Sequence, residues 1–188
     1  ISRAYELAKL FKEKYPGSKV IIGGIHPTVL PDEGLQTGVV DIVARREAEE
    51  TIIELYDAIK NGRDYSNVQG ISYVDGSGKI HHNPEAPLPD LEKLPLFPYD
   101  MFENHIDRYS FGFITSARGC PFNCVFCSQR AISGRVYRYI PVDKVIATLD
   151  IIVNKYHQGY ITFIDDHFIV NRERTKKLCT QMKESGIA

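Results

Sequence analysis

The sequence has 188 residues, of which 43% are hydrophobic, 11% aromatic and 25% charged, and its formal net charge is −1. This length allows one ordinary domain or two small ones, and the composition excludes a disordered chain. A chain so near charge balance lacks the large basic surface that neutralises nucleic-acid phosphates, so no nucleic-acid partner is expected. No apolar run reaches the about 18 to 20 residues needed to cross a bilayer, so we expect a soluble, cytoplasmic protein without a membrane span.

The N-terminal third of the sequence predicts alternating helices and strands. Apolar residues at helical spacing predict a helix over residues 3–15. Short β-branched runs at 19–22 and 39–44 predict buried strands, and a charged helix is expected at 47–61. This order favours α/β layering. Because the sequence begins with Ile1 inside a helical pattern, we expect it to be a piece of a longer protein.

The next segments predict a hairpin followed by a connecting arm. Residues 68–83 alternate apolar and polar side chains around the turn sequence Asp75-Gly76-Ser77-Gly78. Residues 84–102 contain five prolines in nineteen positions, which is incompatible with a helix or a central strand. We therefore predict a first domain at 1–83 and a proline-rich linker at 84–110.

The remaining sequence predicts the order strand, helix, strand, helix. The strands are expected at 111–115 and 160–164, and the helices at 141–157 and 171–185. Such an order begins a parallel sheet, in which ligands bind beyond the carboxyl ends of the strands. We predict a separate domain at 111–188.

Three of the four cysteines, Cys120, Cys124 and Cys127, fall within eight residues directly after the first of these strands. Such clustering indicates a metal site rather than a disulfide framework. A closed structural zinc site takes four ligands, whereas an iron–sulfur cube can be held by three thiolates when one iron takes an outside ligand. A zinc site completed by a histidine such as His105 or His167 is the alternative.

The segment RGCPFNCVFC at 118–127 has the spacing C-x3-C-x2-C, with Phe126 before the third cysteine. It resembles the cysteine loop of the radical S-adenosylmethionine superfamily, which follows the first strand of the catalytic barrel. The resemblance implies that the three cysteines bind a 4Fe-4S cluster, that S-adenosylmethionine chelates its open iron, and that Phe126 lies against the adenine. It also implies a small-molecule substrate and an electron donor such as flavodoxin or ferredoxin.

Asp165 and Asp166 follow the predicted strand at 160–164, where a carboxylate would face the ligand crevice. The resemblance implies that they bind the ribose or amino group of S-adenosylmethionine. The superfamily often has Gly-Gly-Glu at this place, and an aspartate pair is typical of its cobalamin-dependent branch. Arg138 matches an arginine common downstream of the cysteine loop. A capping or solvated acidic loop and a surface arginine are the alternatives.

The segments VIIGGIHPTVLPDE at 20–33 and VDIVARREAEETIIEL at 40–55 resemble the second half of a cobalamin-binding Rossmann-like domain. That domain precedes the radical core in a branch that includes the anaerobic magnesium-protoporphyrin ester cyclase and radical methyltransferases. Gly23 and Gly24 would let the backbone approach cobalamin closely, or would simply form a strand-end turn. The family usually has Gly-Glu-Gly/Ala-Glu before the acidic helix, whereas residues 46–49 are Arg-Glu-Ala-Glu.

Two features near the end of the sequence receive structural interpretations only. The charge run at 172–177 is interpreted as a solvated helix face. Cys179, at helical spacing from apolar neighbours, is interpreted as a small core residue.

The predicted fold is therefore α/β: the C-terminal part of a Rossmann-like cobalamin-binding domain, followed by the first β/α units of a radical S-adenosylmethionine partial TIM barrel. The resemblance implies an iron–sulfur enzyme that reductively cleaves S-adenosylmethionine to a 5′-deoxyadenosyl radical. That radical would serve methylation or oxidative cyclisation of an unactivated substrate carbon, as in oxidoreductases and methyltransferases. The substrate-facing strands are expected to lie outside the sequence. The alternatives are a radical enzyme without cobalamin, similar to methylthiotransferases, and a zinc-stabilised binding module.

Overall fold

The computed structural model describes residues 1–187, apart from the side chains of residues 105 and 107. The chain divides into two compact units. The first unit comprises residues 1–89 and 124–134, and the second comprises residues 90–123 together with the chain from Arg135 onward. The side chain of His105, which the zinc alternative invokes, lies outside the described residues.

The first unit is built on a four-stranded sheet in the order β1-β2-β3-β4. Strands β1 and β2 are parallel, whereas β2 with β3 and β3 with β4 are antiparallel. The predicted strands and the predicted hairpin at 68–83 are confirmed. The bounds of the four strands are Ile21–Gly23, Ile42–Ala44, Ile71–Val74 and Ile80–His82.

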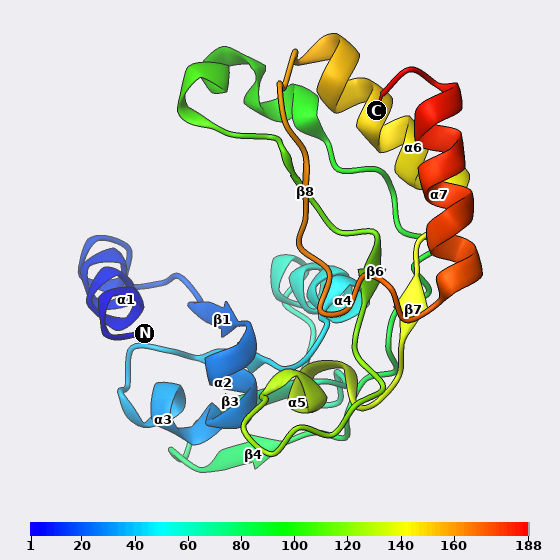
Figure 1. Cartoon of the computed structure of the whole chain (residues 1–188). Coiled ribbons are helices and arrows are strands. Elements are labelled where there is room, and N and C mark those ends of the chain that lie inside the picture. Colours follow the sequence, from blue (N-terminus) through cyan, green and yellow to red (C-terminus); the bar gives the residue numbers. More distant parts are fainter. Residues whose placement is uncertain (188) are drawn as a thin grey trace. The chain divides into compact units, whose positions relative to one another are not determined.

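Both faces of strand β2 are covered, which explains its uninterrupted apolar sequence. Successive strand residues point to opposite faces. Ile42 packs with Leu55 of helix α4 (Glu49–Lys60), and Val43 packs with Leu35 of helix α3 (Pro31–Gln36). Figure 1 labels helices α3 and α4 together with strands β1, β3 and β4 of this sheet.

The other helices of the first unit are α1 (Ser2–Lys14), α2 (Ile25–Val29) and α5 (Gln129–Ser133). The predicted helices at 3–15 and 47–61 are confirmed. Helices α2 and α3 were not predicted, because five or six residues are too few for a helical period to show in the sequence.

The second unit contains the predicted strand–helix–strand arrangement. Strand β5 (Phe113–Ile114) pairs in parallel with β8 (Thr162–Phe163), and α6 (Val142–Asp150) lies between them in the chain. A π-helical turn, η2 (Ile151–Lys155), extends α6, and α7 (Arg172–Glu184) packs against α6 (Figure 1). The predicted parallel pair and both predicted helices are confirmed.

A short antiparallel pair was not predicted, because each of its strands has only two residues. Strand β6 (Ala117–Arg118) pairs with β7 (Arg138–Tyr139), so these strands enclose the cysteine segment in the sequence. The 3₁₀ helix η1 (Tyr99–Arg108) was also not predicted.

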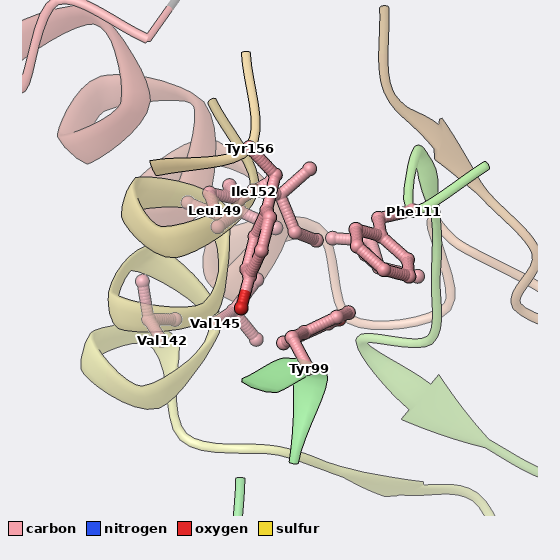
Figure 2. Close-up of a cluster of buried hydrophobic side chains, with 9 residues drawn as sticks. Tyr99, Phe111, Val142, Val145, Leu149, Ile152 and Tyr156 are labelled. Atoms are coloured by element: carbon pink, nitrogen blue, oxygen red, sulfur yellow. The ribbon is translucent and has the colours of Figure 1, made fainter. Parts of the chain in front are cut away.

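The core of the second unit combines aliphatic residues of α6 with aromatic rings from outside it. Figure 2 shows Tyr99 of η1 and Phe111 beside Tyr156. The ring of Phe111 meets that of Tyr99 with centroids 5.3 Å apart and that of Tyr156 with centroids 4.9 Å apart, both edge to face. Leu149 and Ile152 are fully buried beneath these rings. Helix α6 thus carries the apolar stripe that its sequence predicts.

No helix in the described part of the chain is both long enough and apolar enough to cross a membrane.

Candidate functional site

The three clustered cysteines are free thiols. Cys120 is half-buried, whereas Cys124 and Cys127 are exposed. Cys120 belongs to the second unit, and Cys124 and Cys127 belong to the first, where the N–H of Cys127 donates to the carbonyl of Cys124 at 3.1 Å. Among the described residues, no three His, Cys, Asp or Glu side chains are grouped so that they could hold a metal ion. The ligand role of the cysteines therefore stays a prediction.

The donor set nevertheless fits an iron–sulfur cluster. Such clusters are held by cysteine thiolates, and all three thiols of the motif are unblocked by disulfides and at least partly open to solvent. Phe126 is 88% exposed and Val125 is 95% exposed, so neither side chain is occupied by packing.

Asp165 holds the chain where it leaves strand β5. Its Oδ1 accepts hydrogen bonds from the N–H of Ser116 at 2.6 Å and from the N–H of Ala117 at 3.0 Å. Its Oδ2 accepts from the Ser116 hydroxyl at 2.5 Å. These bonds join the carboxyl ends of the parallel strands β5 and β8, the edge at which ligand contacts are expected. Asp165 therefore has a demonstrated structural role, and its predicted contact with S-adenosylmethionine stays a prediction.

Asp166 binds the backbone of the same loop a few residues further on, at Gly119. Its Oδ2 accepts a hydrogen bond from the N–H of Gly119 at 2.9 Å. Gly119 is buried and has a φ of +83°, a conformation that glycine adopts without steric cost. Since Gly119 directly precedes Cys120, the two aspartates together fix the backbone that leads into the cysteine motif.

Arg174 is a buried cation that the sequence analysis missed. It is only 6% exposed, so the interpretation of 172–177 as a wholly solvated face is wrong. Its Nη2 donates to the carbonyl oxygens of Ser116 at 2.6 Å and Ile140 at 3.2 Å, and its guanidinium lies over the ring of Tyr139. The signal was present in the sequence, because Arg174 lies one helical turn before the buried Leu178.

Tyr137 lies within the electrostatic reach of this network. Burial raises the pKa of Tyr137 and the Asp165 carboxylate raises it further, while the Arg174 guanidinium only partly opposes them. The Tyr137 hydroxyl is therefore protonated at neutral pH.

Other predicted site residues are placed as follows. Arg138 lies half-buried in β7, and its predicted role is untested. His167 contacts the ring of Phe122, with centroids 5.4 Å apart. Cys179 is exposed on α7, so its interpretation as a core residue is wrong.

Gly23 and Gly24 lie at the carboxyl end of β1. A Cβ at Gly23 would meet the carbonyl of Ala44 at 3.1 Å, whereas no atom lies within 4 Å of a Cβ built at Gly24. Gly24 begins helix α2 with a φ of +95°. The open space beside Gly24 is compatible with a bound group, and the turn explains the residue equally well.

Comparisons with known proteins show which enzymes this chain is similar to. No family model matches the sequence. The chain is 35% identical over 191 residues to an uncharacterised methyltransferase of Pyrococcus horikoshii, covering 98% of this chain and 41% of the relative. It is 29% identical over 191 residues to the anaerobic magnesium-protoporphyrin IX monomethyl ester cyclase of Rubrivivax gelatinosus, covering 97% of this chain and 34% of that enzyme. The chain thus spans less than half the length of these relatives.

Two solved structures share the fold. The cobalamin-dependent S-adenosylmethionine radical enzyme OxsB, with aqua-cobalamin and S-adenosylmethionine bound, matches with a TM-score of 0.78 at 24% identity, over 96% of this chain and 27% of that one. The radical S-adenosylmethionine methyltransferase TsrM of Kitasatospora setae, with cobalamin and a [4Fe-4S] cluster bound, matches with a TM-score of 0.74 at 17% identity, over 96% and 36%. The curated relatives are thus a methyltransferase and an ester cyclase, and the solved structures that share the fold of this chain are cobalamin-binding radical S-adenosylmethionine enzymes that are at most 24% identical to it.

Proposed function

We propose that this chain forms the cluster-binding part of a cobalamin-dependent radical enzyme that methylates or oxidatively cyclises an unactivated carbon of a small molecule. The observation that carries the proposal is the run of three free cysteines with C-x3-C-x2-C spacing, which follows the parallel strand β5 and lies between β6 and β7 in the sequence. The names of the relatives, a methyltransferase and a cyclase, support the two reaction types.

Cys120, Cys124 and Cys127 would hold a 4Fe-4S cluster that binds S-adenosylmethionine. When bound, the cluster would supply the electron for the reductive cleavage of S-adenosylmethionine to a 5′-deoxyadenosyl radical. Phe126, whose ring is open to solvent, would pack against the adenine. An electron donor such as flavodoxin or ferredoxin would deliver the electron.

The chain itself would contribute to this chemistry by ordering the backbone that precedes the cysteine motif. Asp165 holds Ser116 and Ala117, and Asp166 holds Gly119. The backbone before Cys120 is therefore ordered before any ligand binds, which lowers the conformational entropy lost on binding. Gly23 and Gly24 would face cobalamin at the carboxyl end of β1, in keeping with the open space beside Gly24.

Anaerobic reconstitution with iron and sulfide tests the cluster. We expect about four irons and four sulfides per chain, with an electron paramagnetic resonance signal after reduction. Cys124→Ala should lose most of this iron. Cys179→Ser, which removes an exposed thiol outside the motif, should retain it.

The result that would overturn the proposal is one zinc per chain with negligible iron and sulfide, which the zinc-stabilised binding module predicts. Cobalamin is tested separately, by incubating the protein with aqua-cobalamin and measuring the absorbance that stays with the protein after desalting. Retention of a cluster without cobalamin would favour a radical enzyme similar to methylthiotransferases.

A further inference from the structure

Arg46 has a backbone conformation that arginine rarely adopts. Its φ is +63°, in the left-handed region, and it lies between strand β2 and helix α4. For a residue other than glycine this conformation is strained. Such strain persists only where surrounding contacts fix the residue. The contacts of Arg46 therefore show which parts of the unit hold it in this conformation.

Those contacts connect Arg46 to the segment that follows the third cysteine. The N–H of Arg46 donates to the hydroxyl of Thr28 in α2 at 2.8 Å. Its Nε donates to the carbonyl of Ile132 in α5 at 2.8 Å, although 86 residues separate the two in the sequence. Its Nη1 pairs with Glu85, and its side chain is only 17% exposed.

Helices α2 and α5 pack against each other in the first unit, and Arg46 bonds to both. The unit includes the whole segment from Cys124 to Gly134. Cys124 and Cys127 therefore belong to the same short segment that Arg46 holds at Ile132.

The residue type at position 46 is itself informative. Glycine takes a left-handed φ without strain, whereas arginine does not. Arginine at a left-handed φ is locally unfavourable, and the hydrogen bond from Arg46 to the Ile132 carbonyl offsets this strain.

We propose that Arg46 is a positioning residue that holds helix α5 against α2 and thereby fixes the segment carrying Cys124 and Cys127. The consequence for cluster ligation rests on the proposed function. The fixing of the segment itself does not, because it concerns contacts within the metal-free chain.

Hydrogen exchange of the metal-free chain tests this inference. Arg46→Gly keeps the backbone conformation and the N–H donor to Thr28 but removes the guanidinium. We expect amide exchange in residues 129–133 to accelerate on the order of tenfold, the equivalent of one charge-assisted hydrogen bond. Arg46→Lys, which keeps the charge but not the planar donor pair, should fall between Arg46→Gly and the parent.

Arg63→Ala is the matched control, because it removes an exposed guanidinium that pairs with Asp57 elsewhere in the same unit. It should leave exchange at 129–133 unchanged. The alkylation rate of Cys127 gives a second readout and should rise in Arg46→Gly but not in Arg63→Ala. Unchanged exchange and alkylation in Arg46→Gly would overturn the inference.

The two proposals fail separately. After reconstitution, Arg46→Gly should hold less iron per chain than the parent, with partial rescue in Arg46→Lys. If the parent binds no cluster, the proposed function is wrong, while the exchange and alkylation rates still decide the role of Arg46.

Discussion

Asp165 accepts two hydrogen bonds from one residue, Ser116, which lies 49 positions earlier in the chain. Because Ser116 follows strand β5 and Asp165 follows strand β8, this pair closes the carboxyl ends of the two parallel strands. Ser116 is fully buried, so its N–H and hydroxyl depend on partners within the protein.

Asp165→Asn is expected to lower the free energy of unfolding by about 2–3 kcal/mol. Both carboxylate oxygens of Asp165 accept hydrogen bonds from Ser116 or Ala117, whereas the amide nitrogen of asparagine cannot accept one. Urea unfolding at pH 7 measures this loss. Glu173→Gln is the control, since Glu173 forms only an exposed pair with Lys176 and should change stability by less than about 0.5 kcal/mol. Equal effects of the two variants would contradict the closing role of Asp165.

Arg174→Met is expected to cost about 2–4 kcal/mol, because it removes the buried donor from the Ile140 carbonyl and leaves the Ser116 carbonyl with the Ile140 N–H alone. Arg172→Met changes an exposed residue of the same helix and should stay within about 0.5 kcal/mol of the parent. Both are compared by chemical unfolding. If the two variants were equally stable, the buried guanidinium would not stabilise the second unit.

Gly112→Ala is expected to destabilise the second unit strongly. A Cβ at Gly112 would lie 2.5 Å from the carbonyl oxygen of Tyr160, so the backbone beside β5 or β8 would have to move. The expected loss is about 2–4 kcal/mol. Gly159→Ala, next to Tyr160, has nothing within 4 Å of its added methyl group and should be neutral or slightly stabilising. Thermal unfolding of both variants checks the contrast.

Asp41 should make the first unit sensitive to acid. Burial alone would raise the pKa of the Asp41 carboxyl, but the Lys12 ammonium at 2.7 Å, the Val20 N–H at 2.7 Å and nearby Lys19 outweigh it, so the pKa is lowered. A carboxyl with a lowered pKa in the folded state contributes stability above its unfolded pKa of about 3.9, and this contribution disappears as the pH falls through the folded value.

The variant Asp41→Asn should therefore be less stable than the parent by about 1–2 kcal/mol at pH 7. The difference between the two proteins should shrink as the pH falls from about 5 to below 3. Urea unfolding across this range measures the difference. A difference that stayed constant would show that the Asp41 charge does not contribute.

The longer elements could be predicted from local sequence patterns. Helix α6 was found because its apolar residues recur at helical spacing, and the β3–β4 hairpin because alternation flanks the turn at Asp75-Gly76-Ser77-Gly78. The two-residue strands β6 and β7 have no such signature, since two residues cannot show a period. Tertiary contacts alone define them.

In the candidate site, too, the local features could be predicted from the sequence and the long-range contacts could not. The cysteine motif is a local spacing, so it could be read directly. The partners of Asp165, Arg174 and Arg46 lie 49, 58 and 86 positions away, and no local pattern encodes such distances. For Arg174, helical spacing predicts a position on the buried face of the helix, but it does not predict that Ser116 is the hydrogen-bond acceptor.

The position of Tyr99 in the aromatic core limits where the protein can be shortened. A version beginning at Phe111 would leave the rings of Phe111 and Tyr156 facing water on the side that Tyr99 covers. Exposed aromatic surface of this kind promotes aggregation. A truncation meant to isolate the second unit should therefore begin no later than Asp90, which retains the buried Leu91 as well.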